Sequence, residues 1–375
     1  MRIAYVCSDP GIPFLGFKGA SVHVREITSA LQGRGHSVHA ASVNVGQGNV
    51  APSLTAFQKL PWDPFEQRAV LDRFLVEAGA DVVLERYSLE SGPARDASRK
   101  LGLVLVLEVN APIVLEAARF RKLADVDGAL QREATAFEQA QAIVVVSRGL
   151  EDYVRRRSPR TPVFLVRNGV AVERFRPPFH GSALDVPAEA VVIGFVGSMK
   201  PWHGVHELFD AFVGIADVFP TARLVMVGTG PEEESLRRRA EDSRHRERIH
   251  ILGAIPHEGV PGILTRFDIA VAPYRPIESF YFCPLKVLEY MAAGLPIVFP
   301  AIGDIPEIVG DAGVDYEAGS IGGLSHAISG LVEDAERRRS LGRSALARSA
   351  ALTWDRAAER IGSLLEDAIR RGPEG

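Results

Sequence analysis

Short apolar runs alternate with stretches of helical spacing along the whole sequence, and this alternation most constrains the fold. The runs are rich in Val, Ile and Leu, which is typical of strands covered by helices on both faces. Strands separated by helices form βαβ units and parallel sheets, so the sequence predicts the α/β class. The expected strands are Ile3–Cys7, Val38–Ser42, Val82–Glu85, Leu103–Val109, Ile143–Ser147 and Val163–Val166 in the first half, and Val191–Val196, Arg223–Val227, Ile249–Leu252, Ile269–Ala272, Ile297–Phe299 and Val314–Tyr316 in the second.

The two halves are predicted to be separate doubly wound domains. A length of 375 residues suits two domains of roughly 100–200 residues each. Residues 173–187 carry Pro177, Pro178, Gly181 and Pro187 with little apolar periodicity, which indicates a linker. The expected parts are an N-terminal domain over residues 1–175, a C-terminal domain over 176–353, and a final helix over 354–375 that is a candidate to cross back to the first domain.

The segment ESFYFCPLKVLEYMAAGLPIVFP combines two features that suit a sugar nucleotide. Pro284 fits the first turn of a helix, where its missing N–H is no loss. Amides around Phe282, Cys283 and Leu285 would then point out of a helix N-terminus, which attracts phosphate. Glu289 lies further along, where a carboxylate accepts hydrogen bonds from sugar hydroxyls. The alternative is an ordinary α/β helix with a solvated glutamate.

A second candidate is the turn in FVGSMKPWHGV, after the first strand of the second half. Gly197 ends the strand, and Ser198, Lys200 and His203 follow before the next helix. A hydroxyl, an ammonium and an imidazole at a helix start suit a diphosphate. Because polar residues are common in such turns, an ordinary surface turn is the alternative.

Other glycine-rich turns follow strands in both halves. Gly16 and Gly19 lie between the first strand and its helix, without the GxGxxG spacing of nicotinamide-binding proteins. In the second half, Gly228 in VGTGP and Ile255 after the next strand could hold a nucleobase through backbone groups. Loop glycines that contact no ligand are the alternative.

Polar residues at strand ends of the first half mark the expected acceptor side. Arg86 lies in ERY and Glu108 and Asn110 lie in EVN, each at the end of a predicted strand. Ligands of doubly wound sheets bind beyond these ends, so two facing sheets place the site in the cleft between the domains. Ion pairs that hold loops together are the alternative for these residues.

Composition argues against several classes of protein. A net charge of −4 disfavours a dedicated nucleic-acid binder. The two cysteines, Cys7 and Cys283, form neither a disulfide framework nor a metal-ligand cluster, which fits a reducing cytoplasm. The sequence has no apolar stretch of about 18 residues, so no transmembrane span is expected.

Charged clusters outside these turns have competing interpretations. Asp125 and Asp127 resemble an acidic motif that holds a divalent ion in some sugar-nucleotide enzymes, but a solvated surface is favoured and no metal is predicted. The basic stretches 119–123 and 155–157 suit either solvated helix surface or contact with an anionic acceptor or lipid. Peripheral contact with the inner membrane surface therefore stays open.

Taken together, these segments resemble glycosyltransferase family 4, a large family of retaining enzymes with the GT-B fold. The likeness rests on FVGSMKPWHGV, ILGAIPHEGVPGIL, PLKVLEYMAAGLPIV and GDIPEIV in the second half, and on LQGRGHSV, ERYSL, LEVNAP and RNGV in the first. It implies two doubly wound, Rossmann-like domains that face each other across a cleft. The first would bind the acceptor and the second a nucleoside-diphosphate sugar.

The resemblance also implies roles for particular residues. Glu289 corresponds to the family glutamate that binds the nucleotide ribose, and the backbone over 282–285 would meet the donor sugar and diphosphate. The turn over 197–204 would hold the diphosphate, and Asn110 stands where many members have a His near the reacting sugar. The predicted substrate-binding residues are Gly16, Gly19, Ser198, Lys200, His203, Gly228, Ile255, Phe282, Cys283, Pro284, Leu285, Lys286 and Glu289, and the predicted catalytic residues are Arg86, Glu108, Asn110 and Lys200.

The chain departs from the family pattern at the charged positions of the donor side. Ser198 and His203 stand where the commonest pattern has an Arg and a Lys, and Lys200 is the expected replacement. Tyr281 stands where the family often has a second glutamate, and the nearby Glu278 is an uncertain substitute. Which residues supply the missing charges is not decided by the sequence.

The predicted function is transfer of a hexose-type sugar with retained anomeric configuration, with no metal or other cofactor. Helix-terminal amides and Lys200 would stabilise the leaving diphosphate, and a front-face mechanism is the default by family analogy. The alternatives are a nucleotide-sugar epimerase on the same fold and a binding protein that has lost catalysis. An Arg- and Ala-rich composition hints at a GC-rich bacterial genome. The base, the sugar, the acceptor and the oligomeric state are left open.

Overall fold

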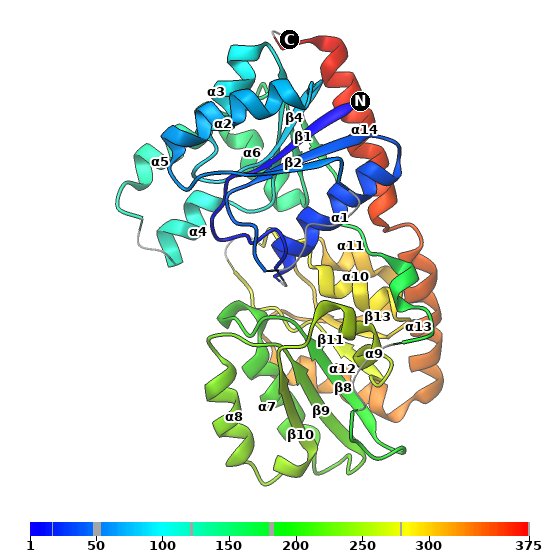
Figure 1. Ribbon diagram of the computed structural model, residues 1–375. Helices are drawn as coiled ribbons and strands as arrows, with labels where there is room; N and C mark the ends of the chain where they lie inside the picture. The colour runs from blue at the N-terminus through cyan, green and yellow to red at the C-terminus, as the bar shows by residue number, and fades with distance from the viewer. Residues whose placement is uncertain (17, 48–53, 121–122, 180–183, 278–279, 374–375) are drawn as a thin grey trace. The chain divides into compact units, whose positions relative to one another are not determined.

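The computed structural model describes residues 1–16, 18–47, 54–120, 123–179, 184–277 and 280–373. The chain divides into two compact units, each with its own parallel sheet (Figure 1). Unit 1 comprises Met1–Asn168, Tyr281–Cys283 and Trp354–Gly375, and unit 2 comprises Gly169–Phe280 and Pro284–Thr353. Gly181 of the expected linker, Glu278 of the expected donor segment and part of the 119–123 basic stretch lie outside the described residues.

Within the described residues, the sheet of unit 1 has seven parallel strands in the order β3-β2-β1-β4-β5-β6-β7. The strands are β1 (Arg2–Cys7), β2 (Ser37–Ser42), β3 (Ala56–Lys59), β4 (Val82–Arg86), β5 (Val104–Val109), β6 (Ala142–Val145) and β7 (Val163–Leu165). The chain runs outward from β1 to β3 and then restarts at β4 on the other side of β1. The neighbouring ends of β1 and β4 are therefore the switch point, where ligands of doubly wound sheets bind.

The helices of unit 1 come from both ends of the chain. They are α1 (Gly19–Gly33), α2 (Pro64–Glu77), α3 (Gly92–Leu101), α4 (Ile113–Phe120), α5 (Val126–Glu138), α6 (Arg148–Arg157) and α14 (Trp354–Arg371). The last helix, α14, packs against α1, where Arg34 pairs with Asp355 at 2.9 Å and with Glu359 at 3.0 Å. The apolar side of α14 is buried, including Ala358 and Leu365 at 0% exposure, so the end of the chain is part of the first core.

The sheet of unit 2 has six parallel strands over the described residues, in the order β10-β9-β8-β11-β12-β13. They are β8 (Val191–Val196), β9 (Ala222–Val227), β10 (Ile249–Gly253), β11 (Ile269–Val271), β12 (Ile297–Pro300) and β13 (Gly313–Tyr316). The helices are α7 (Val205–Ile215), α8 (Glu233–Glu241), α9 (Val260–Leu264), α10 (Leu285–Ala292), α11 (Ile305–Val309), α12 (Ile321–Glu333) and α13 (Ala335–Ser349). The switch point here lies between β8 and β11.

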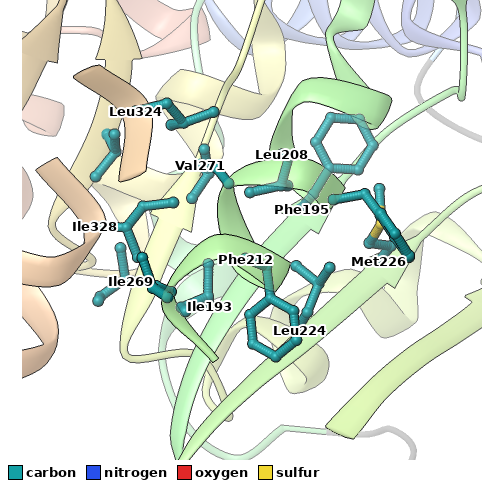
Figure 2. Close-up of a cluster of buried hydrophobic side chains, with 14 of the residues drawn as sticks. Ile193, Phe195, Leu208, Phe212, Leu224, Met226, Ile269, Val271, Leu324 and Ile328 are labelled. Carbon is teal, nitrogen blue, oxygen red and sulfur yellow. The ribbon is translucent and has the colours of Figure 1, made fainter. Parts of the chain in front are cut away.

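The core of unit 2 joins its sheet to the helices α7 and α12 (Figure 2). Phe195 comes from β8, Phe212 from α7 and Ile328 from α12, and all three are 0% exposed. Burying one such side chain contributes about 1.5–3 kcal/mol. The turns that leave the ends of β8 and β9 therefore start from a rigid base.

Each expected strand is present, with its ends shifted by no more than about two residues. The strand β3 was not predicted, because AFQK has no continuous apolar run and its ends are exposed. Figure 1 also shows the two separate sheets that the alternation of strands and helices predicts. None of the helices described here has the length and apolarity to cross a membrane.

The unit boundary differs from the expected one in two places. Unit 1 ends at Asn168 rather than at residue 175, and residues 281–283 group with unit 1 although they were expected in the second domain. Two side chains of unit 1 hold this short segment. The Ser147 hydroxyl donates to the Tyr281 carbonyl at 2.7 Å, and the Asn168 amide donates to the Cys283 carbonyl at 2.8 Å.

Candidate functional site

The turns of unit 2 at the switch point pack so closely that only glycine fits at several positions. A Cβ on Gly228 would lie 2.0 Å from the Gly197 carbonyl oxygen, and a Cβ on Gly204 would lie 1.6 Å from the Pro273 carbonyl oxygen. The Gly228 amide also donates to the Gly253 carbonyl at 2.7 Å. The turns after β8, β9 and β10 are thus packed directly against one another at the end of β8, with glycines where a side chain would not fit.

The predicted polar residues of the first turn lie where the sequence expected them. Ser198 is exposed and Lys200 half-buried before a short 3₁₀ helix, η2 (Pro201–His203). The Nδ1 atom of His203 contacts the Ser198 carbonyl, and since a carbonyl only accepts, Nδ1 carries the proton. Burial and the nearby Lys286 lower the pKa of His203 to about 2. His203 is therefore neutral and supplies no cation to this turn.

Lys286, the second residue of α10, lies beside the same turn. A Cβ on Gly197 would be 2.6 Å from Lys286 Nζ, so the ammonium group packs directly over that glycine. The Nζ atom is 4.1 Å from the ring centroid of Phe195 and 5.1 Å from that of Tyr274. Lys286 is only 8% exposed, and among the described residues its Nζ has no hydrogen-bond partner. Burial lowers the pKa of Lys286 to about 7, against the opposing attraction of Glu289.

The helix α10 is anchored to β8 by a buried tyrosine. The Tyr290 hydroxyl accepts a hydrogen bond of 2.7 Å from the Val196 amide, one residue before Gly197. Tyr290 is 0% exposed, so this contact fixes the helix against the end of the strand. Lys286 reaches the turn after β8 because of this anchor.

Glu289 lies three residues after Lys286, on the same face of α10. Its Oε1 atom is 2.8 Å from Nε2 of His257, which lies in the short 3₁₀ helix η4 (His257–Gly259) after β10. A carboxylate only accepts, so His257 donates from Nε2 and fixes the orientation of Glu289. The second oxygen, Oε2, can still accept hydrogen bonds from a diol. No local sequence pattern links His257 to Glu289, because the two residues are far apart in the chain.

The beginning of α10 differs slightly from the expected one. Pro284 is at the N-cap position, with φ −76° and ψ 112°, and the helix proper starts at Leu285. The first-turn amides of an α-helix have no intrahelical partners, so those of Leu285 and Lys286 suit an anion. Phe282 and Cys283 belong to unit 1, and the Cys283 carbonyl is held there by Asn168. The predicted donor segment is therefore divided between the two units.

Tyr281, at the position where a glutamate was expected from the resemblance, has a partner of its own. Its hydroxyl donates to the Glu116 carboxylate on α4. Burial and this carboxylate raise the pKa of Tyr281 well above its usual value, so the hydroxyl stays protonated. A carboxylate is thus present next to this position, carried by Glu116 of unit 1.

The acceptor-side candidates of unit 1 include a buried carboxylate, Glu108, that is fully enclosed. Glu108 is 0% exposed and accepts from Tyr5 at 2.8 Å and from His23 Nε2 at 2.6 Å, while Arg86 Nη1 is 3.9 Å away. Burial alone would raise the pKa of Glu108, but His23 and Arg86 outweigh it and lower the pKa to about 2. In this structure, Glu108 contacts His23, Tyr5 and Arg86 and is closed to solvent.

His23 is a residue that the sequence analysis missed. Its Nδ1 atom is 2.8 Å from Oδ1 of Asn168, whose amide nitrogen already donates to the Cys283 carbonyl. Both ring nitrogens of His23 therefore face acceptors, the Asn168 oxygen and the Glu108 carboxylate, so both donate and the ring is an imidazolium. A lone His on the helix α1 gave no signal in the sequence.

The remaining candidate residues, three in unit 1 and Ile255 in unit 2, differ in how closely they are packed. Asn110 follows β5, and its buried Nδ2 has no hydrogen-bond partner among the described residues, which suits a ligand contact. Gly16 is closely packed, because a Cβ there would lie 2.5 Å from Pro13 and 2.8 Å from Ser21 Oγ. Gly19 opens α1, and Ile255 is half-buried in the loop after β10.

The acidic pair of unit 1 has a structural use. The Asp125 carboxylate caps α5 by accepting from the Gly128 amide at 2.9 Å, and it pairs with Arg132 at 3.2 Å. These two contacts lower the pKa of Asp125. Over the parts of the chain that the structure describes, no group of three or more His, Cys, Asp or Glu side chains is arranged to hold a metal.

Both halves of the chain match described protein families. Residues 17–174 match the family described as Glycosyltransferase Family 4, and residues 190–334 match Glycosyl transferases group 1. The chain is 32% identical over 165 residues to 2-deoxystreptamine N-acetyl-D-glucosaminyltransferase of Streptomyces fradiae, which covers 42% of this chain and 37% of that one. It is 28% identical over 210 residues to D-inositol 3-phosphate glycosyltransferase of Corynebacterium glutamicum, which covers 54% and 48%. The chain thus spans less than half the length of these relatives.

Solved structures share the fold over nearly the whole chain. Sucrose-phosphate synthase of Thermosynechococcus elongatus superposes with a TM-score of 0.80 at 20% identity, covering 99% of this chain and 100% of that one. HepE of Anabaena, solved in complex with UDP, gives a TM-score of 0.79 at 16% identity, covering 98% and 100%. The two parallel-sheet units thus define a GT-B protein, as the sequence predicted. With both halves matched by the family descriptions, the chain belongs to the family 4 glycosyltransferases.

Proposed function

We propose that this chain transfers a hexose-type sugar from a nucleoside diphosphate to an acceptor, with retention of the anomeric configuration. The observation that carries the proposal is the pair of Glu289 and His257 in unit 2. The histidine orients a carboxylate beside the glycine-lined turns at the switch point, where nucleotides bind in doubly wound folds. That carboxylate would accept hydrogen bonds from the ribose hydroxyls of the donor.

The relatives support a nucleotide-sugar donor. HepE has been solved with UDP and with UDP-glucose, and the curated relatives are named for transfer of sugars. Family membership and the glycine-lined turns extend this chemistry to the present chain. The base and the sugar are left to the binding experiment.

In the proposed reaction, the chain acts mainly by preorganised electrostatics. The first-turn amides of α10 and the turn over residues 197–204 would stabilise the negative charge that develops on the leaving diphosphate, and the sequence suggested Lys200 as their cation. Metal-free charge stabilisation is part of this proposal. Glu108 is enclosed by Tyr5 and His23, so a front-face displacement is preferred to a covalent intermediate on that carboxylate.

The acceptor would be bound by unit 1. In the described chain the buried amide nitrogen of Asn110 makes no hydrogen bond, and Arg86 Nη1 makes none beyond its 3.9 Å ion pair with Glu108, so both suit acceptor hydroxyls or phosphates. In this scheme Glu108 is a positioning residue, because it holds His23 and Arg86 rather than the acceptor. Both cysteines are buried and neither forms a disulfide within the described residues, which fits our proposal of a bacterial cytoplasmic enzyme with peripheral membrane contact as an option.

The test is calorimetric titration of UDP-, GDP- and ADP-sugars, followed by transfer assays with NMR detection of the product anomer. We expect one base to bind, and we expect Glu289→Ala to weaken binding about tenfold to hundredfold, as for loss of charge-assisted hydrogen bonds. Glu258→Ala is the matched control, because Glu258 is an exposed carboxylate next to His257. A wild-type chain that binds none of the donors, or a Glu289→Ala variant that binds normally, would refute the proposal.

The alternatives make different predictions in the same experiment. An epimerase would exchange a sugar proton with solvent in the absence of acceptor. A binding protein without catalysis would bind donor tightly and give no turnover over a broad acceptor panel. An inverted anomer in the product would contradict retention while leaving the donor site intact.

A further inference from the structure

Lys286 is a buried ammonium-bearing side chain beside a turn that lacks its expected cations. The positions that commonly carry Arg and Lys in the family hold Ser198 and His203 here, and His203 is neutral because burial and the nearby Lys286 lower its pKa to about 2. Lys200, the sequence-based replacement, has its Nζ 5.7 Å from the centroid of the Trp202 ring. Among the described residues, Lys200 in this turn and Lys286 beside it are thus the two ammonium groups near the end of β8, and Lys286 is the more deeply buried of them.

The surroundings of Lys286 point to a ligand rather than to a structural ion pair. Its Nζ has no hydrogen-bond partner in the described part of the chain, although the residue is 8% exposed. An unpaired buried ammonium is costly, and buried polar groups in proteins are normally satisfied. The rings of Phe195 and Tyr274 compensate only partly, since a cation–π contact contributes up to about 2 kcal/mol. Such strain is typical of a site whose partner arrives with the ligand.

The packing around Gly197 is a second, independent observation that favours a ligand-binding role for Lys286. It adopts φ +148°, and a Cβ at this position would be 2.6 Å from Lys286 Nζ and 2.8 Å from its Cε. The glycine therefore lets the lysine reach the end of β8, at the switch point where the diphosphate is expected. Helix α10 also directs its first-turn amides from the same location, because Lys286 is the second residue of that helix.

We propose, building on the nucleotide-sugar function above, that Lys286 is the cation that binds the donor diphosphate, in place of Ser198, His203 and Lys200. The ammonium group leaves the Phe195 and Tyr274 rings and donates to phosphate oxygens. Glu289, three residues further along the same helix face, contacts the ribose of the same donor. One face of α10 thus recognises both halves of the nucleotide.

Binding of a diphosphate should change the protonation state of Lys286. Burial holds the pKa of Lys286 at about 7, so in the free protein the amine is partly neutral near neutral pH. A bound diphosphate favours the charged form, so binding takes up a proton. The charged and titratable groups facing Lys286 are Glu289, which favours its protonation, His203, whose pKa is far too low for it to take up this proton, and Tyr274, whose ring centroid lies 5.1 Å from Nζ. Affinity should fall as the pH rises above about 7, because more protonation work is then required.

The experiment is calorimetric titration of the nucleoside diphosphate that binds, in buffers of different ionisation enthalpy at several pH values. We expect the wild type to take up about half a proton at pH 7 and more at pH 8, as a group with a free pKa of about 7 requires. Lys286→Arg should keep the affinity at pH 7 within about tenfold and abolish the uptake, because arginine is always charged. Lys286→Met should lose the uptake and weaken binding about tenfold to hundredfold.

Matched variants separate this proposal from its rivals. Lys200→Met should retain the proton uptake, and so should His203→Gln. The corresponding nucleoside, which lacks phosphates, should bind with no uptake in any variant. If the wild type binds no nucleoside diphosphate at all, the proposed function itself fails. If it binds with equal affinity in the wild type and Lys286→Met, or if uptake disappears in Lys200→Met instead, only the assignment of Lys286 is overturned.

Discussion

At the scale of single residues, the two units differ in what surrounds a buried charged side chain. Glu108 in unit 1 is enclosed by Tyr5, His23 and Arg86, and its negative charge is matched by an imidazolium. Lys286 in unit 2 is also buried, but its amine packs against the rings of Phe195 and Tyr274 and makes no hydrogen bond within the described chain. The first arrangement stabilises a fold, and the second leaves a group available for a ligand.

The Glu108 cluster predicts a specific loss of stability. Glu108→Gln should lower the free energy of unfolding by about 3–5 kcal/mol, because it leaves the buried His23 cation without its counter-charge. The native pKa of Glu108 is lowered to about 2, so its contribution is present above the unfolded-state value near 4.5 and is lost as the pH falls toward 2. Urea unfolding at several pH values measures both effects.

Two controls accompany this measurement. The double variant His23→Gln/Glu108→Gln should be less destabilised than the sum of the single variants, since the two residues share one interaction. Additive single losses, or a Glu108→Gln protein with the wild-type dependence of stability on pH below 4.5, would contradict the ion pair.

At the scale of elements, the glycine turns after β8 and β9 are the most demanding part of unit 2. Gly204 has φ +67° and caps α7 directly against the Pro273 carbonyl. A side chain there meets both a left-handed backbone and a carbonyl oxygen at 1.6 Å, so neither a rotamer change nor a small shift relieves it.

Gly204→Ala should therefore destabilise the protein by about 2 kcal/mol or more. Gly322 is the matched control, because it is exposed in α12 and a Cβ there has no atom within 4 Å among the described residues. Gly322→Ala should be neutral or stabilise by up to about 1 kcal/mol. Thermal unfolding of the two variants side by side is the measurement, and similar midpoints for both would be inconsistent with the tight turn.

The sequence predicted the strands and the turns between strands and helices better than it predicted contacts between individual residues. Buried parallel strands are visible as Val, Ile and Leu runs, so the sheets and the turns after β8 and β9 were found. The edge strand β3 was missed because a short, partly exposed strand does not need such a run. Contacts between distant residues left no periodic signal, which is why His23 and the link from His257 to Glu289 appeared only in the structure.

At the scale of the whole molecule, the chain order does not follow the two units. The final helix α14 completes the first unit, and residues 281–283 group with it although they lie next to α10 in the sequence. Sequence patterns predicted two halves with a boundary at residue 175, whereas unit 1 ends at Asn168. Side-chain hydrogen bonds from Ser147 and Asn168, which no local pattern encodes, draw the short segment into unit 1.

Both the proposed function and the role of Lys286 require that unit 2 binds a nucleoside diphosphate at the end of β8 and on one face of α10. Hydrogen–deuterium exchange of the full chain, with and without the nucleoside diphosphate that binds, tests this most directly. We expect slowed exchange in residues 197–204, 228–230 and 285–289, and weaker protection of the same segments in Glu289→Ala at a matched ligand concentration just above the wild-type dissociation constant. Saturating ligand that leaves these three segments unchanged, or that protects other segments instead, would contradict it.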